Sequence, residues 1–358
     1  MKRMKYWLLP VLLSLLLPAG ATEIPDELWK ALPEGTERIV QSADLSGGHG
    51  IAAGLSAIGE ALRGQAVSVL RQRLRGAVTV LLAVLLCGAV DGFARSTGKP
   101  PELLPAVGAL SVTLAAAGSL ESLIGLGAGL VAELSDFSRV LLPALAAATA
   151  LSGAVSSATV QQLAAVAFSD LLVHLIRKVL LPMVYLYIGA LTAAACLPSG
   201  RLAGLAEAIR KAVTWTLSGA LIAFTVYLSV VHVISGAADA AAVKLAKAAV
   251  SGVVPVVGGI LSDAAETVLA GAGALRGTIG AFGTLAVLGA CAWPFLNLGV
   301  QYLLYKMTAF LAGTVGPPEL CRLIDGLGNA FGLLLGMTAT CAVVVLISIL
   351  SCVSAVMP

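Results

Sequence analysis

Residues 331–353 read FGLLLGMTATCAVVVLISILSCV, and this stretch decides the fold. It contains no Asp, Glu, Lys or Arg, and it is longer than the roughly 20 apolar residues that a helix needs to cross a bilayer. Because lipid offers no partners for backbone polar groups, a spanning segment of this kind must satisfy its hydrogen bonds internally. The stretch therefore predicts a membrane-spanning α-helix.

Six further apolar runs of spanning length occur along the chain. They are residues 76–94, 103–120, 140–157, 179–197, 213–234 and 279–304. The run 123–131 is too short to span alone and is expected to extend the preceding span or to re-enter the membrane. The stretch 243–275 is interrupted by Pro255 and is expected to form two half-helices or an interfacial hairpin. We predict an all-α, polytopic helical membrane protein with about six to eight spans.

The composition favours the same class of protein. Hydrophobic residues make up 59% of the chain and charged residues 11%, against roughly 45–50% and 25% in soluble proteins. The mean hydropathy is +0.98. The formal net charge of +3 is small, and the basic residues are scattered along the chain without forming one basic face. Nucleic acid is therefore not an expected partner. The lipid bilayer is the expected solvent, and 39 glycines favour closely packed helices.

The N-terminus has the pattern of a cleavable secretory signal peptide. Lys2, Arg3 and Lys5 precede the apolar run 6–17, and an Ala-Gly-Ala sequence ends at Ala21. A basic start, a short apolar region and small residues at the end predict cleavage after Ala21. The alternative is an uncleaved signal anchor. In both cases the following residues begin on the far side of the membrane.

Three segments are expected along the chain. Residues 1–21 form the signal peptide, and residues 22–75 form an extracytoplasmic or interfacial segment with an acidic start. Residues 76–358 form the helical transmembrane domain, with its broken or re-entrant part near 243–275. The segment 22–75 is too short to support an independent catalytic domain.

Asp170, His174 and Arg177 form a candidate polar cluster within the membrane. Their spacing of four and three residues places them on one face of a helix. Ionisable groups inside a membrane are costly and often functional, so one hypothesis is a proton or ion relay. The alternative is an amphipathic helix over 161–178, lying at the interface before the span 179–197.

A candidate assembly or gating element consists of Pro255, Gly258, Gly259, Asp263 and Glu266. Proline and paired glycines break a helix, and the carboxylates three residues apart fit the capping of a new helix start. The functional alternative is a broken-helix ion or substrate site of the transporter type.

The sequence contains no pattern for catalysis, cofactor binding or a resident metal. None of its six cysteines forms a CxxC motif, and neither an HExxH motif nor a GxxxxGK[ST] phosphate loop occurs. We therefore predict no catalytic residues, no cofactor and no metal site, and we expect that the protein is not an enzyme.

Three stretches together resemble one protein family. They are DFSRVLLP at 136–143 running on through TALSG at 149–153, RLAGL at 201–205 and, above all, KLAKAAVSGVVPVVGGILSDAAETVLAGA at 244–272. In a polytopic chain that begins with a signal peptide, this combination is similar to the stage III sporulation protein AE family, over about residues 76–350.

The resemblance implies a place and a set of partners. The family belongs to the membrane of the mother cell that surrounds the forespore in endospore-forming bacteria. There it is a subunit of the stage IIIA trans-envelope channel, or feeding-tube, complex, which is required for late forespore development. The implied partners are the other stage IIIA proteins and a forespore membrane protein. The resemblance carries over no catalytic residues. The alternative function is a secondary transporter or permease subunit that uses the broken helix around 255–266.

Overall fold

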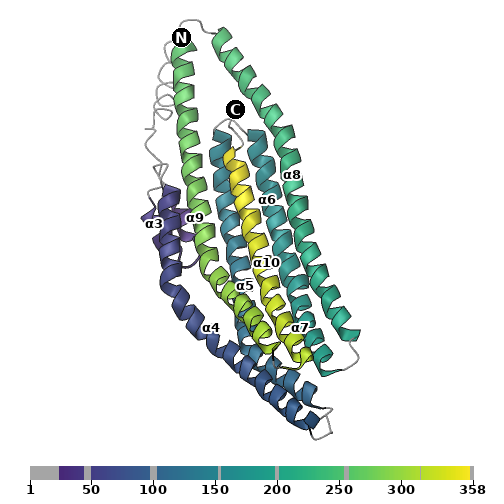
Figure 1. The fold of residues 1–358 in the computed structure, drawn as a ribbon. Coiled ribbons are helices and arrows are strands. Elements are labelled where there is room, and N and C mark those ends of the chain that lie inside the picture. The colour runs from purple at the N-terminus through teal and green to yellow at the C-terminus, as the bar shows by residue number, and fades with distance from the viewer. Residues whose placement is uncertain are drawn as a thin grey trace.

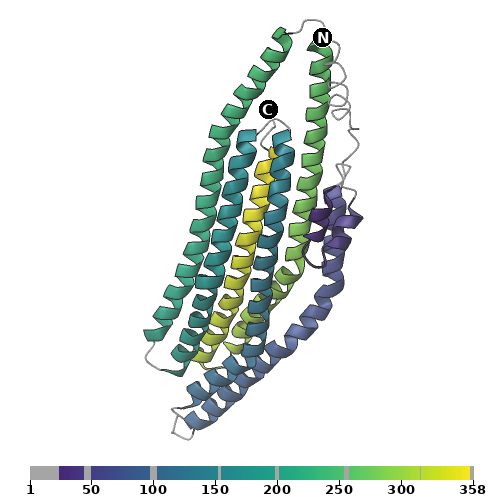
Figure 2. The same cartoon turned by 180° about the vertical axis from the view of Figure 1, so that it is seen from behind.

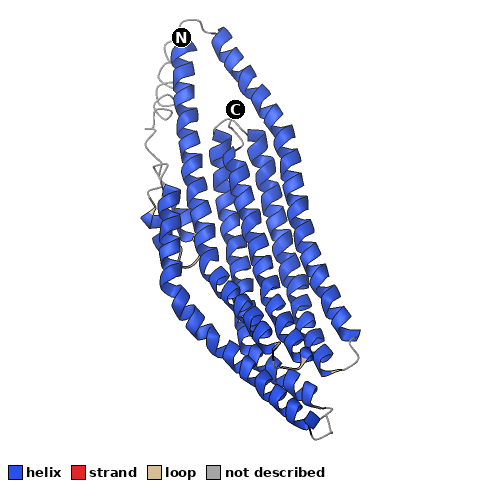
Figure 3. Ribbon diagram, in the orientation of Figure 1, coloured by secondary structure: helices blue, strands red, loops and turns tan. Residues whose placement is uncertain are grey.

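The computed structural model describes residues 24–43, 50–96, 103–151, 155–197, 201–253, 258–314 and 316–354. All regular secondary structure in these ranges is helical, which confirms the predicted all-α class (Figure 3). The helices are α2 (Asp26–Lys30), α3 (Glu37–Ser42), α4 (Gly50–Ser96), α5 (Leu104–Leu151), α6 (Val155–Leu175), the π-helical turn η1 (Ile176–Leu180), α7 (Leu181–Cys196), α8 (Arg201–Val253), α9 (Gly258–Ala312) and α10 (Pro318–Ser354).

The long helices lie side by side in an elongated bundle (Figure 1). Helix α10 occupies the centre and contacts α5, α6, α7, α8 and α9. Helices α4 and α8 lie at opposite edges, as the view from behind also shows (Figure 2). The adjoining ends of α8 and α9 project beyond the C-terminal end of α10, and the α4–α5 hairpin projects at the other end.

Six helices in the described ranges are long and apolar enough to cross a membrane. They are Ile51–Ala94, Leu104–Leu151, Gln162–Cys196, Leu202–Val231, Ala274–Ala312 and Pro318–Val353. This number agrees with the predicted span count, and the whole run 331–353 lies within the last of these helices. The chain is therefore a helical membrane protein by fold.

The prediction of separate spans at 103–120 and 140–157 is wrong. Helix α5 is continuous from Leu104 to Leu151, and the short run 123–131 lies inside it. The charged residues between the two runs do not end the helix, because the Arg139 guanidinium pairs with Asp136 on the same helix and with Asp170 on α6. Pro143 also lies within α5, since the carbonyl it leaves unpaired can be satisfied by its surroundings.

The helix that contains α6 and α7 changes its hydrogen-bond pattern at η1. The N–H group of Leu181 donates to the carbonyl of Ile176, five residues earlier. Pro182 follows directly, and its ring lacks an N–H and clashes with the carbonyl four residues before it. A π turn accommodates this clash without ending the helix. One continuous helix over 155–196 therefore replaces the predicted alternative of a separate interfacial helix at 161–178.

The N-terminal segment packs against the bundle. Leu28 and Val40 are buried, and the ring of Trp29 lies edge-on to Phe282 of α9 with 5.2 Å between ring centroids. The buried hydroxyl of Thr36 donates to the carbonyl of Pro33 at 2.6 Å. Helix α4 then runs unbroken through the expected segment boundary at residues 75 and 76.

Candidate functional site

Asp170 lies at a contact between α5 and α6. Its Oδ1 accepts hydrogen bonds from Nε and Nη2 of Arg139 at 3.1 and 2.9 Å. Ser135 Oγ lies 3.5 Å from the same oxygen, and Arg139 Nη1 reaches Asp136 Oδ1 at 3.4 Å. The carboxylate of Asp170 thus has its cation on a neighbouring helix, and the pair ties α5 to α6.

The other two members of the predicted polar cluster lie apart from this ion pair. His174 and Arg177 are exposed, and Arg177 belongs to η1, where the π turn changes the helical register. The structure therefore brings Asp170 together with Arg139 of α5, a residue the sequence argument did not associate with it. A relay through Asp170, His174 and Arg177 stays a prediction.

The assembly or gating element lies largely outside the described part of the chain. Residues 254–257, with Pro255, are not described, and at Gly258, Gly259, Asp263 and Glu266 the structure describes only the helical backbone. The backbone shows α8 ending at Val253 and α9 beginning at Gly258, so Asp263 is the sixth residue of α9.

A second charged cluster lies near the start of α8. Glu207 Oε2 accepts from Arg210 Nε at 2.9 Å, and Glu207 Oε1 accepts from Arg210 Nη2 at 2.7 Å. Lys211 Nζ lies 3.7 Å from the same Oε1. These residues are three and four positions apart, so one turn of α8 brings them together. The cluster carries two positive charges and one negative charge.

An interhelical ion pair lies at the same end of the bundle. Lys306 Nζ of α9 donates to Asp325 Oδ1 of α10 at 2.6 Å, and Asn329 Nδ2 donates to Asp325 Oδ2 at 3.3 Å. One residue further along α10, the carbonyl of Gly326 accepts from the buried hydroxyl of Tyr187 at 3.1 Å. These contacts join α7, α9 and α10.

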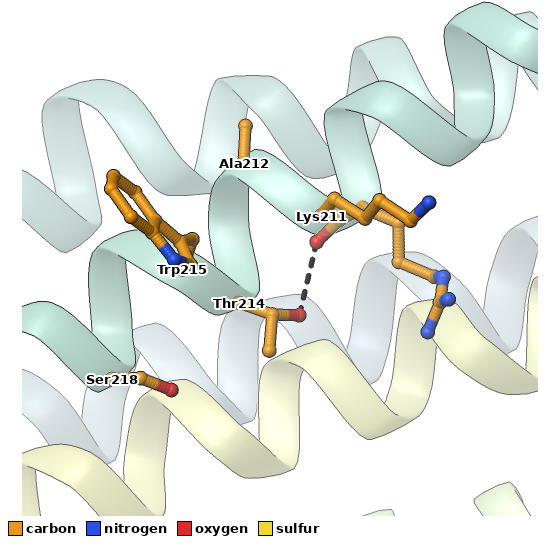
Figure 4. A pocket seen from close by; sticks show the side chains of 6 residues that line it. Lys211, Ala212, Thr214, Trp215 and Ser218 are labelled. Atoms are coloured by element: carbon orange, nitrogen blue, oxygen red, sulfur yellow. Dashed lines mark hydrogen bonds between the residues drawn. The ribbon is translucent and has the colours of Figure 1, made fainter.

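Two cavities adjoin the α8 cluster. A cavity of about 320 Å³ opens between α8, α9 and α10, and its lining includes Arg210, Tyr302 and Asn329. A cavity of about 490 Å³ lies along α8 (Figure 4). It is lined by Arg210, Lys211, Ala212, Thr214, Trp215 and Ser218. We call this second space the α8 cavity.

The sequence contained a signal for the α8 cluster but not for the interhelical pair. Glu207, Arg210 and Lys211 have the spacing of a helical ion-pair network, and they directly precede an uncharged run. Lys306 and Asp325 are 19 positions apart, and their meeting depends on the turn between α9 and α10. No local pattern could reveal that contact.

The polar contacts of these sites are ion pairs and hydrogen bonds between charged side chains. Within the described ranges, His, Cys, Asp and Glu side chains form no group of three or more that could hold a metal ion. The Arg139–Asp170 and Lys306–Asp325 pairs join helices, and the lining of the α8 cavity includes two cations and two hydroxyl groups.

The fold and these contacts define a helical protein with six helices of membrane-spanning length in the described ranges, in which ion pairs join α5 to α6 and α9 to α10. The chain belongs to the stage III sporulation protein AE family, whose sequence pattern it matches over residues 53–356. The match confirms the resemblance and extends it to residues N-terminal to 76. No curated protein and no solved structure matches the chain.

Proposed function

We propose that the protein is a membrane subunit of the sporulation stage IIIA trans-envelope channel complex between mother cell and forespore. The observation that carries this proposal is the family match over residues 53–356, which covers all six helices of spanning length apart from the first residues of the first one. Its place is the mother-cell membrane around the forespore, and its role is required for late forespore development.

The subunit acts by assembly and carries out no reaction of its own. Within the subunit, the Arg139–Asp170 and Lys306–Asp325 pairs connect helices to one another. Energy for transport then comes from a partner. The proposed partners are the other stage IIIA proteins and a forespore membrane protein.

Co-purification from sporulating cells tests the proposal. A tagged chain, crosslinked in the cell and purified in mild detergent, is expected to bring down the other stage IIIA proteins and the forespore partner. The same chain expressed in vegetative cells is the control. If crosslinked material contains none of these proteins, the proposed assembly is wrong. Solute uptake by the purified chain alone in liposomes would instead identify a transporter.

We also propose that residues 1–21 are a signal peptide, which directs export of the N-terminal segment and is then cleaved. N-terminal sequencing of the membrane-inserted protein is expected to give Thr22 as the first residue. Retention of Met1 would show that residues 1–21 act as an uncleaved anchor. The channel role does not depend on this outcome, because the family match begins at residue 53.

The proposed assembly or gating element can be tested by substitution. Asp263→Ala combined with Glu266→Ala is expected to lower spore yield while the protein still accumulates in the membrane. Glu60→Ala combined with Glu121→Ala removes two exposed carboxylates elsewhere and is the control. Normal spore yield in the Asp263/Glu266 variant would exclude this role for the element.

A further inference from the structure

One face of α8 changes from charged to apolar along its length. Lys211, Trp215, Ser218, Ile222 and Val226 follow one another at three- and four-residue spacing, which places them on the same face of the helix. Trp215 is 83% exposed, and Ile222 and Val226 are exposed as well. This face, which we call the α8 outer face, is covered by none of the described helices.

The α8 cavity at the start of this face offers hydrogen-bond donors and positive charge. Glu207 occupies Nε and Nη2 of Arg210 and leaves Nη1 for another acceptor. The side chain of Lys211 is 73% exposed, and its Nζ lies 3.7 Å from Glu207. Trp215 adds an indole N–H donor, while no carboxylate belongs to the cavity lining. A group that only accepts hydrogen bonds and carries negative charge suits this lining.

The hydroxyl groups of Thr214 and Ser218 line the part of the cavity that is nearer to the apolar part of the face. Thr214 Oγ1 donates to the carbonyl of Arg210 at 3.0 Å, which leaves its lone pairs as acceptors (Figure 4). Ser218 lies one turn further along α8 and also lines the cavity. The side chains on this face therefore change from charged at Lys211, through the polar groups of Trp215 and Ser218, to apolar at Ile222.

The cavity lies at the edge of an apolar segment of bilayer length. Residues 212–231 contain no Asp, Glu, Lys, Arg or His, and as a helix they rise about 30 Å, the thickness of the hydrocarbon core. Lys211 directly precedes this segment and Trp215 lies one turn inside it. Basic residues and Trp are enriched at this depth, where lipid headgroups lie.

We propose that the α8 cavity binds the phosphate group of an anionic phospholipid whose acyl chains lie along the α8 outer face. From Trp215 to Val226 the helix rises about 16 Å, close to half of the hydrocarbon core and thus to one leaflet. Lys211 and Arg210 Nη1 contact the phosphate, the Trp215 indole covers the glycerol region, and Ile222 and Val226 contact the chains. Basic residues next to a membrane-spanning segment attract anionic lipid headgroups.

Native mass spectrometry of the full-length protein in detergent tests this site. Phosphatidylglycerol and phosphatidylcholine with identical acyl chains are added separately, and inorganic phosphate is added as a competitor. Phosphatidylglycerol is expected to bind more tightly than phosphatidylcholine, and Lys211→Gln is expected to weaken its binding about fivefold. Lys178→Gln, which removes an exposed cation outside the cavity lining, is expected to leave binding unchanged.

Four results would overturn the proposal. They are equal affinity for the two lipids, unchanged affinity in Lys211→Gln, an equal loss in Lys178→Gln, and displacement of the lipid by inorganic phosphate. The last result would assign the cavity to a free anion. Because Lys211 is largely exposed, its substitution is expected to leave the thermal midpoint unchanged, so loss of binding reports on the site and not on folding.

Discussion

Helices α10 and α8 are both apolar enough to span a membrane, yet they occupy opposite environments. Within the most apolar window of each, 61% of α10 residues are buried inside the protein, against 22% for α8. Helix α10 is surrounded by five other helices, whereas α8 lies at an edge (Figure 1). Apolar composition therefore marks a helix for the membrane but does not decide whether it faces protein or lipid.

The contacts of the two helices show where the difference originates. Phe331 of α10 packs against Tyr305 of α9 with ring centroids 5.1 Å apart, and Gly332 leaves space for Tyr302. On α8, Phe224 stacks on Phe168 of α6, but Trp215 and Ile222 on the other side of the helix are exposed. Between helices in lipid, stability comes from such close packing and not from removal of apolar surface from water.

Truncation of a buried α10 side chain is expected to give the largest loss of stability. Leu334 is buried at 1% exposure, so Leu334→Ala leaves a cavity and is expected to cost about 2–5 kcal/mol. Ile222→Ala on the α8 outer face is the matched variant and is expected to change stability by less than about 0.5 kcal/mol. Thermal unfolding in detergent measures both. Equal losses of stability in the two variants would show that α10 and α8 do not differ in how much their side chains stabilise the fold.

A smaller loss of stability is expected where a side chain is added at a tightly packed glycine. A Cβ at Gly283 of α9 would lie 2.5 Å from Leu141 Cδ2, and Leu141 is fully buried. Gly283→Leu is therefore expected to destabilise the protein by about 1–3 kcal/mol. The control is Gly277→Leu on the same helix, where a Cβ meets nothing within 4 Å. Chemical denaturation of both variants measures the two stabilities. A loss at Gly283 alone would show that this side of α9 faces protein and that Gly277 does not.

The smallest effects are expected at the two interhelical ion pairs. The Lys306 and Asp325 side chains are 29% and 49% exposed, while those of Arg139 and Asp170 are 54% and 42% exposed. Exposed pairs contribute about 0–1 kcal/mol, and less where water reaches both partners. Double-mutant cycles that convert each residue to Ala are expected to give a larger coupling energy for Lys306–Asp325. The reverse order would show that exposure does not govern these pairs.

The sequence predicted the helical class and most spans because each of these depends on local composition. The run 331–353 contains no charge, and α10 covers it. The separation of 140–157 from 103–120 failed because the helix continues through Asp136 and Arg139, which lie between the two runs and each have a partner in the folded protein. A helix can continue through charged residues when its neighbours neutralise them.

The candidate sites were less predictable because their partners come from distant parts of the chain. Asp170 was identified as a polar group within the apolar region, but its partner Arg139 lies on the preceding helix. Lys306 and Asp325 gave no local signal, since their pairing requires two helices in a particular register. The α8 cavity combines a recognisable charge spacing with an exposure of Trp215 that only the assembled bundle defines.

The length of α8 has a further consequence for what the protein can touch. Its 53 residues form a rod of about 80 Å, more than twice the thickness of the hydrocarbon core. If residues 212–231 occupy that core, the helix from 232 to Val253 continues for about 33 Å beyond it, and α9 returns from the same height. The adjoining ends of these two helices, at Val253 and Gly258, then lie well clear of the lipid headgroups.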